Sequence, residues 1–374
     1  MTRSVAFAAI LLAAVLAGCA TTEPQAPSAP RLGAAAGRAL VERLLPANLE
    51  DRAGWAADIH AAFAALDLAE TPQSVCAAIA VAEQESGLRA DPPVPGLARI
   101  ARKEIDARRE RAGVPGLVLD AALALPSSNG KSYGERLDAV TTEGQLSELY
   151  DDFIGRVPFG RTLFADRNPV RTGGPMQVGV SFAQAELDAR PYPYPSSGSA
   201  RHEVFTRRGG LYFGIAHLLD YRAPYDRYLY RFADFNAGRY ASRNAAFQQA
   251  LTQVSGIPLT PDGALLRVDD GKVAAAPSAT EAAAQSVARR LGMRPGDVRG
   301  DLAQGRSDAF AQTALYTRVF DQADRLAGRR VARAALPQIV LHSPKITRRL
   351  TTAWFAERVD ARFRQCLQRD RVDG

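Results

Sequence analysis

The chain has 374 residues, of which 47% are hydrophobic and 23% are charged. This balance is typical of a globular protein with a sizeable core, and it excludes collagen, coiled coils and polytopic membrane proteins. The formal net charge is +7 and no run of five like charges occurs, so a dedicated nucleic-acid-binding arm is not expected.

The N-terminus predicts an exported lipoprotein. An apolar stretch, Val5–Leu16, is too short to span a bilayer and indicates a signal peptide over residues 1–18. Its Leu-Ala-Gly-Cys ending resembles the bacterial lipobox, which implies cleavage before Cys19, acylation of that cysteine and anchoring by the lipid. Ala20, a residue other than Asp after the cysteine, implies the periplasmic face of the outer membrane. The alternative is an ordinary cleaved signal peptide in which Cys19 is incidental.

Residues 19–35 are rich in Pro, Ala and Ser and predict a flexible tether. From residue 36 to 374, apolar residues recur at helical spacing, as in Trp55, Ile59 and Phe63, which predicts a single α-rich domain. A short hairpin is expected within 258–279, around an Asp-Gly turn. Further helices are predicted at 98–112, 134–155, 181–189, 209–222, 225–237, 241–254, 280–291, 307–327 and 351–369.

Two cysteines remain in the mature chain, Cys76 and Cys366. Export would place them where disulfides form, so they are candidates for a bridge. Two buried free thiols on separate helices are the alternative, because nothing in the sequence fixes their separation.

Common catalytic and metal-binding motifs do not match this sequence. Gly130-Lys131-Ser132 resembles the end of a phosphate-binding loop, but Leu125 stands where the first glycine is needed. The histidines do not form a spacing that binds metal, so neither a metal site nor a cofactor is expected. These residues are His60, His202, His217 and His342.

The most informative segment starts at Thr71, which can cap a helix that has Pro72 at its first position. The run 75–82 is apolar on every face, so this helix is expected to be buried all round. Gly87 is a natural helix terminator, which places Glu85 in the last turn. The helix dipole and partial desolvation would both raise the pKa of a carboxyl there, as a general acid requires. The alternative is a solvated glutamate at a fraying end.

Three short motifs then occur in order along the chain. They resemble the Glu-Ser, Gly-Leu-Met-Gln and Ala-Tyr-Asn-Ala-Gly motifs of the lysozyme-like lytic transglycosylases. A glycine-containing, leucine-rich segment at 208–219 also resembles the family helix between the last two motifs. The motifs are Glu85-Ser86-Gly87, Gly174-Pro175-Met176-Gln177-Val178 and Phe235-Asn236-Ala237-Gly238.

This resemblance implies a mainly α, lysozyme-like helical domain with a large helical insertion at about 90–170 and a C-terminal extension at about 256–374. It covers about 71–89, 172–182 and 205–255. The chain departs from the family at Pro175, where an apolar residue is usual, and at Phe235, where the family has Tyr.

The resemblance also implies the chemistry. Glu85 would protonate the glycosidic oxygen between N-acetylmuramic acid and N-acetylglucosamine, and would then act as a base while a 1,6-anhydro ring closes. The implied partners are peptidoglycan glycan strands, with the membrane reached through the lipid anchor. The other implied site residues, which would contact the sugar or support Glu85, are Ser86, Met176, Gln177, Phe235, Asn236 and Tyr316.

Two alternatives stay open on the sequence. A protein with this fold could bind peptidoglycan as a scaffold without cleaving it, because the altered motifs and the insertion could close the groove. A hydrolase of the goose-lysozyme type would instead activate water and leave a reducing end.

Overall fold

The computed structural model describes residues 32–195, 199–269, 272–341 and 350–372. The signal peptide, the lipidation candidate Cys19 and nearly all of the expected tether lie outside these residues. The first helix begins at Ala34, two residues inside the segment expected to be a tether. Within the described ranges, no helix combines the length and the apolar character that a membrane span requires.

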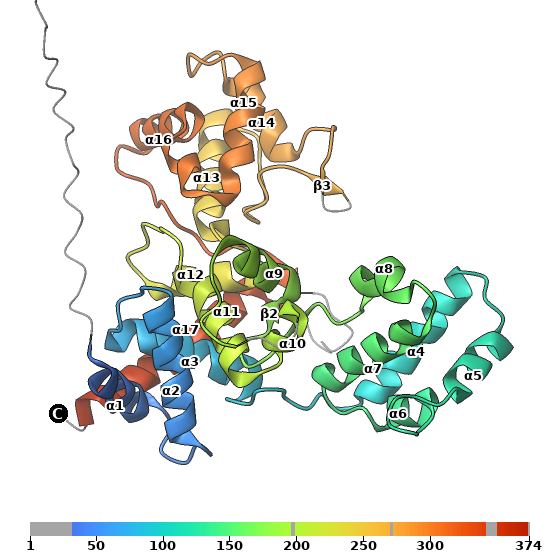
Figure 1. The fold of residues 1–374 in the computed structure, drawn as a ribbon. Coiled ribbons are helices and arrows are strands. Elements are labelled where there is room, and N and C mark those ends of the chain that lie inside the picture. Colours follow the sequence, from blue (N-terminus) through green and yellow to red (C-terminus); the bar gives the residue numbers. More distant parts are fainter. Residues whose placement is uncertain (1–31, 196–198, 270–271, 342–349, 373–374) are drawn as a thin grey trace, which may run out of the picture.

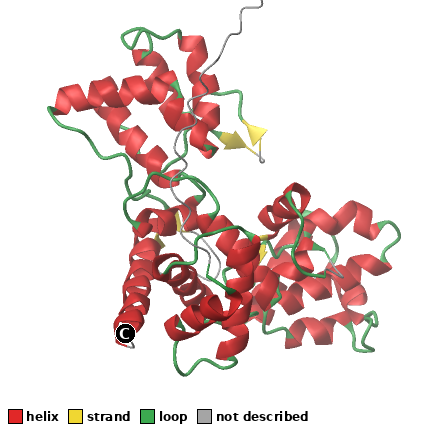
Figure 2. Cartoon of the chain, turned by 60° about the vertical axis from the view of Figure 1, so that its left-hand side comes forward, coloured by secondary structure: helices red, strands yellow, loops and turns green. Residues whose placement is uncertain are grey.

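The protein is mainly α-helical, as predicted. Helices and three short antiparallel strand pairs account for its regular structure (Figures 1 and 2). The longer helices are α1 (Ala34–Leu44), α2 (Arg52–Ala65), α3 (Pro72–Ser86), α4 (Leu97–Arg111), α5 (Gly116–Ala124), α6 (Tyr133–Ala139), α7 (Glu143–Arg156), α9 (Val180–Ala189), α11 (Arg207–Leu219), α12 (Tyr228–Ala237), α13 (Ala241–Ser255), α14 (Ala279–Val287), α15 (Pro295–Ala303), α16 (Ala314–Ala327) and α17 (Thr352–Val372).

Two shorter helices and six strands complete the list of elements that the argument uses. The expected hairpin within 258–279 is confirmed, because β3 pairs with β4 in antiparallel register. Strand β1 pairs with β2, and β5 pairs with β6, also antiparallel. These elements are α8 (Gly160–Phe164), α10 (Ala200–Val204), β1 (Thr172–Gly173), β2 (Val178–Gly179), β3 (Val268–Asp269), β4 (Lys272–Val273), β5 (Val340–Leu341) and β6 (Leu350–Thr351).

Three hydrophobic clusters organise these helices. The first cluster is built from α1–α3, β2, α9–α12 and α17. The second is built from α13–α16 and the loops between them, and it forms the upper part of the molecule in Figure 1. The third is built from α4, α6 and α7 with partly buried residues of α5, and it forms the lobe at the right of the same view. We call this third part, residues 97–164, the insertion lobe.

The expected insertion thus has a core of its own, but the expected extension divides in two. Helices α14–α16 pack with α13 in the second cluster. Helix α17 instead returns to the first cluster, where Phe355 and Val359 are buried. A disulfide between Cys76 of α3 and Cys366 of α17 fixes this return across 290 residues of sequence, with Cα atoms 5.6 Å apart. The pairing that the sequence left open is therefore present.

The helix expected at 134–155 is in fact two helices, α6 and α7. Thr142 caps α7 through its side chain, with Gln145 completing a capping box. Thr142 also pairs with Pro93 in an isolated antiparallel bridge, so the chain is extended at this point. This cap and this contact interrupt the helix that the continuous apolar spacing of 134–155 predicts.

Candidate active site

Helix α3 begins and ends as its sequence predicts. The Thr71 side chain accepts a hydrogen bond from the Ser74 amide, and Ser74 completes a capping box. Pro72 occupies the first turn, where its missing N–H costs nothing. Gly87 terminates the helix in the left-handed conformation, with φ of 62°. Every residue of 74–82 is buried, as expected for a helix that is apolar on all faces.

Glu85 lies in the last turn of this buried helix and is partly accessible to solvent. Among the described residues its carboxyl has no hydrogen-bond or ion-pair partner to stabilise a negative charge. The protein packed around it desolvates the group and raises its pKa to about 7. A carboxyl with this pKa holds its proton near neutral pH and can also release it, as an acid and base in one reaction must.

The second motif forms a tight hairpin between β1 and β2. Gly174 has φ of 75°, and a Cβ added there would lie 2.0 Å from the carbonyl oxygen of Val204. Gln177 also has positive φ, at 49°, which is uncommon for a residue with a side chain. Strain of this kind persists where surrounding packing imposes it, so the hairpin holds a fixed shape against α10 and α11.

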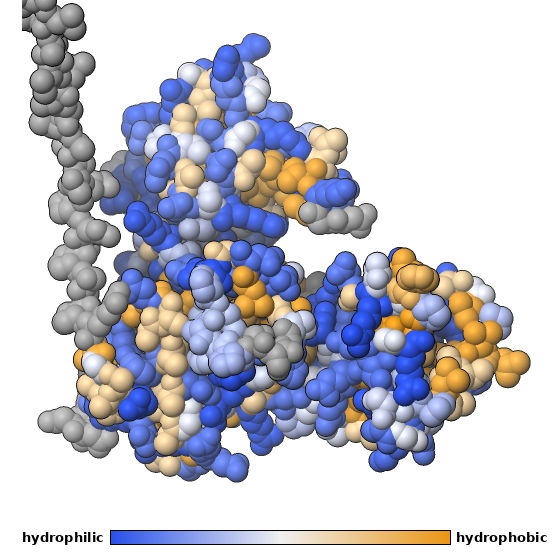
Figure 3. All heavy atoms as spheres, viewed as in Figure 1, coloured by the Kyte–Doolittle hydropathy of each residue, from blue (hydrophilic) through white to orange (hydrophobic). Residues whose placement is uncertain are grey.

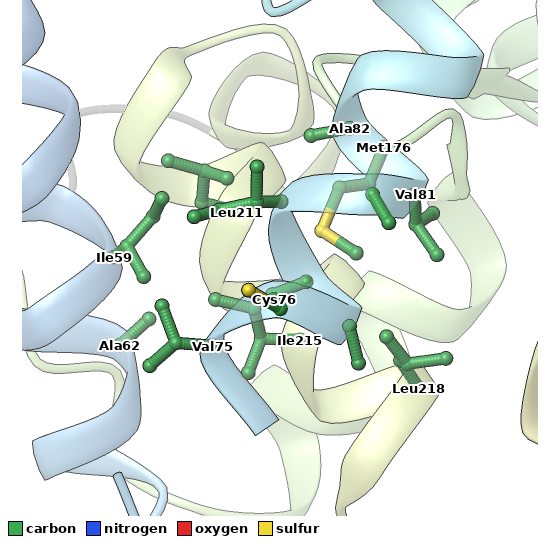
Figure 4. Packing of buried hydrophobic residues seen from close by; sticks show 14 of the residues in the cluster. Ile59, Ala62, Val75, Cys76, Val81, Ala82, Met176, Leu211, Ile215 and Leu218 are labelled. Carbon is green, nitrogen blue, oxygen red and sulfur yellow. The ribbon is translucent and has the colours of Figure 1, made fainter. Parts of the chain in front are cut away.

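Met176 anchors this hairpin to the end of α3. It is fully buried, and Figure 4 shows it beside Val81 and Ala82 of α3. Gly214 of α11 makes room for it, since a Cβ there would lie 2.5 Å from the Met176 sulfur. Met176 therefore contributes to the apolar surroundings of the C-terminal part of α3.

Gln177, next to Met176, is partly exposed. Its amide nitrogen donates to the Gly174 carbonyl at 3.3 Å, and its amide oxygen accepts from the Thr172 hydroxyl at 3.4 Å. Both bonds are long, so a ligand that offers better geometry can replace them. The side chain is thus available for a sugar hydroxyl or acetamido group.

The third motif closes α12. Phe235 is partly buried and packs edge-on against the ring of His217, 5.0 Å between centroids. Asn236 is exposed, and its amide oxygen accepts a hydrogen bond from the Thr352 hydroxyl at 2.9 Å. This bond occupies the acceptor of Asn236 but leaves its amide N–H groups for a ligand.

Ser86 bonds to the backbone and, among the described residues, makes no hydrogen bond to Glu85. It is buried, and its hydroxyl donates to the Ala82 carbonyl at 2.9 Å and accepts from the Arg89 amide at 3.1 Å. It therefore closes the helix end and is not available to a substrate.

Tyr316 does not take the place facing Glu85 that the resemblance implies. It lies on α16 in the second cluster, where its ring stacks on Phe247 and contacts Phe310 and Phe320. Figure 1 shows α16 in the upper part of the molecule, away from α3. A tyrosine on an apolar helical stripe here serves the core, so it does not face Glu85.

The structure thus brings Met176 against the helix that carries Glu85 and places Phe235 at the edge of the same cluster. In the described part of the chain, no hydrogen bond or ion pair joins Glu85 to Gln177 or Asn236. A substrate would have to bridge these groups.

Sequence reasoning missed a buried polar network beside the third motif. Asp234 is fully buried and accepts hydrogen bonds from the Tyr225 hydroxyl at 2.7 Å and from the amides of Tyr240 and Ser242 at 2.9 and 2.7 Å. Burial raises the pKa of Asp234, while these donors oppose that shift. The network fixes the turn after Asn236. The only signal in the sequence is an acidic residue within an otherwise apolar stretch of helix.

His217 was expected either at the surface or in the core, and the structure places it at the core. Burial and the nearby Arg239 guanidinium lower its pKa to about 4, so the imidazole is neutral at physiological pH. The Arg239 guanidinium donates to the carbonyls of Ala216 and His217, at the end of α11, and lies over the Phe182 ring.

A search of the described residues for three or more His, Cys, Asp or Glu side chains able to hold a metal ion finds no such group.

Comparisons with known proteins place the chain in a family. The family model described as "Protein of unknown function (DUF1615)" matches residues 48–369. The "Uncharacterized protein YaiW" of Escherichia coli (strain K12) is 49% identical over 359 residues, which cover 96% of this chain and 97% of that protein. No solved structure matches the chain. The length of the match and the identity together show that this chain belongs to the DUF1615 family.

Proposed function

We propose that this protein is a lytic transglycosylase that cleaves the bond between N-acetylmuramic acid and N-acetylglucosamine in murein. The proposal rests chiefly on Glu85, a carboxyl with a pKa of about 7 in the last turn of a helix whose residues 74–82 are all buried. It includes a lysozyme-like arrangement of α3, the β1–β2 hairpin and α12, and anchoring of the chain at the periplasmic face of the outer membrane through Cys19.

The reaction requires a single carboxyl. Protonated Glu85 gives its proton to the glycosidic oxygen as the bond from the muramic C1 to that oxygen breaks. The acetamido oxygen of the substrate stabilises the positive charge at C1. The Glu85 carboxylate then takes the proton of the muramic 6-hydroxyl while the oxygen of that hydroxyl bonds to C1. The 1,6-anhydro ring closes in this step, and Glu85 is protonated again. No water is consumed, and a second carboxyl of the kind used by ordinary glycosidases is not needed.

The neighbouring groups support this chemistry in distinct ways. Met176 excludes water from one side of the α3 terminus and so favours the protonated form of Glu85. Gln177 and the N–H groups of Asn236 offer donors to sugar hydroxyls and to the acetamido carbonyl. Because Tyr316 and Ser86 do not face the substrate, this site has fewer polar groups than the resemblance implies. This favours, as the second candidate function, a scaffold protein that binds peptidoglycan without cleaving it.

The test is product analysis. Protein that begins at Ala20 is incubated with purified sacculi, and the released fragments are identified by mass spectrometry. We expect anhydro-muramic products from the wild type and none from Glu85→Gln. Glu83→Gln is the matched control, because it removes a carboxylate two residues away on the same helix, and it should retain activity.

Each other result changes the assignment. Products with reducing ends would indicate a hydrolase. A folded wild-type protein that binds sacculi without releasing fragments would indicate a scaffold. Equal activity of wild type and Glu85→Gln would remove Glu85 from the mechanism.

A further inference from the structure

The insertion lobe contains a large cavity that the proposed function does not use. Its volume is about 940 Å³, within the range typical of ligand-binding pockets. Four helices line it with mainly apolar side chains, including Ile105 of α4, Leu123 of α5, Leu137 of α6 and Leu149 and Phe153 of α7. None of the motif residues discussed above lines this cavity.

Helix α5 forms one wall and is unusual in its packing. It is almost entirely apolar, yet none of its residues is buried. Leu119 and Leu123 line the cavity, while Leu117 on another face is 80% exposed. An apolar helix is normally covered by packed side chains. Leu123 on the inner face of α5 packs against the third cluster, but it also lines the cavity together with Leu119, so the core of the lobe is incompletely filled under this helix.

Basic side chains without ion pairs stand at the opening. Arg99 and Lys103 lie one turn apart on α4, line the cavity and are exposed. Arg171, in the segment before β1, also lines the cavity and is exposed. In the described part of the chain, none of the three has an acidic partner. Other basic residues of α4 are paired, as Arg108 is with Glu104.

The cavity therefore carries a net positive charge at its edge. Four basic side chains line it, namely the three unpaired residues and Arg108, against two carboxylates, Glu104 and Glu143. Unpaired cations beside an apolar hollow match a molecule with an apolar body and an anionic end. A neutral apolar ligand would leave these charges without a role.

We propose that this cavity binds the acyl chain of an anionic amphiphile, with the chain under α5 and the anionic head beside Arg99, Lys103 and Arg171. The ligand is a long-chain fatty acid or an anionic phospholipid, which share this chemistry. The site is separate from Glu85, so this inference stands whether or not the protein cleaves murein.

The test measures binding to the chain that begins at Ala20. Displacement of a dansylated undecanoic acid probe reports the affinities of palmitate and of methyl palmitate. The protein is also incubated with phosphatidylglycerol vesicles, reisolated and examined by native mass spectrometry. Palmitate binding in solution identifies a fatty acid site, whereas a phospholipid recovered from vesicles without palmitate binding identifies a phospholipid site.

Two pairs of variants test the two parts of the ligand. Lys103→Glu should weaken palmitate binding about tenfold, since it places like charges together, and should leave methyl palmitate binding unchanged. Lys131→Glu is its control, because Lys131 is exposed in the same lobe and does not line the cavity. For a vesicle-derived phospholipid, Lys103→Glu should reduce the amount recovered and Lys131→Glu should not.

Ala122→Trp places a large ring in the part of the cavity under α5 and should strongly weaken binding of both palmitate and methyl palmitate. Ala121→Trp, at the exposed neighbouring residue that does not line the cavity, should bind as the wild type does. Circular dichroism and thermal unfolding check that each variant is folded. The proposal is overturned if the folded wild type binds neither palmitate nor phospholipid, or if binding is indifferent to both Lys103→Glu and Ala122→Trp.

Discussion

The core around α3 and the insertion lobe bury apolar helices in opposite ways. Every residue of 74–82 in α3 is buried, the helix is joined to α17 by a disulfide, and the β1–β2 hairpin beside it packs on α10 and α11 at distances that only glycine allows. Helix α5 is about as apolar, yet it has no buried residue and borders a cavity of about 940 Å³. Figure 3 shows apolar surface over the part of the lobe that contains α5.

The difference separates two uses of apolar residues. Dense packing around α3 leaves no room for a ligand inside, but it desolvates Glu85 at the helix end and so alters its acidity. Loose packing around α5 leaves space inside the lobe and uncovered apolar surface. The first region is suited to chemistry at its edge, and the second to binding within it.

The largest effect that would test this comparison is the pH dependence contributed by Glu85. Its pKa is raised from 4.5 to about 7 in the folded protein, so the folded state holds the proton more tightly than the unfolded state. The contribution of this carboxyl to the free energy of unfolding is therefore greatest below pH 4.5. It is lost as the pH rises towards 7, and the loss is at most about 3 kcal/mol. Glu85→Gln, which stays neutral, should gain stability relative to wild type across this window. Urea unfolding at a series of pH values measures the difference.

A matched change at a residue that does not titrate checks the origin of this effect. Gln84→Ala alters the same helix turn, so its stability offset from wild type should be independent of pH. If the offset of Glu85→Gln were also constant from pH 4 to 8, the carboxyl of Glu85 would not be desolvated as the structure indicates.

Two glycine substitutions compare the packing of the regions directly. A Cβ at Gly214 of α11 would lie 2.6 Å from Cβ of Met176, so Gly214→Ala should destabilise the protein by about 2 kcal/mol. At Gly116 of α5 nothing lies within 4 Å, so Gly116→Ala should be neutral or stabilise by up to about 1 kcal/mol. Thermal or denaturant unfolding measures both, and equal effects would contradict the contrast in packing.

The smallest effect is expected at the exposed face of α5. Leu117→Ser should change the free energy of unfolding by less than about 0.5 kcal/mol, because Leu117 is 80% exposed. Leu137→Ala in the same lobe, where Leu137 is 2% exposed, should cost about 2 to 4 kcal/mol. A large loss for Leu117→Ser in denaturant unfolding would show that α5 is covered in solution.

Much of the fold follows from local features of the sequence. The limits of α3 could be predicted because a capping residue, Pro72 and Gly87 act within one turn of where they stand. The hairpin within 258–279 could be predicted for the same reason, because its turn residues are a local signal. The division of 134–155 was missed because its apolar spacing continues across the break. Thr142 and Gln145 form a local capping box there, and the pairing of Thr142 with Pro93, about fifty residues earlier in the chain, holds the chain extended.

The candidate site shows the same limit. The sequence by itself determined that Glu85 stands in the last turn of a buried helix, since helical period and a terminating glycine suffice for that. Only the tertiary structure decided that Tyr316 belongs to another cluster and that Cys366 reaches Cys76. Backbone hydrogen bonds and side-chain spacing act over a few residues, whereas the partners of a side chain are chosen by packing between segments that lie far apart in the chain.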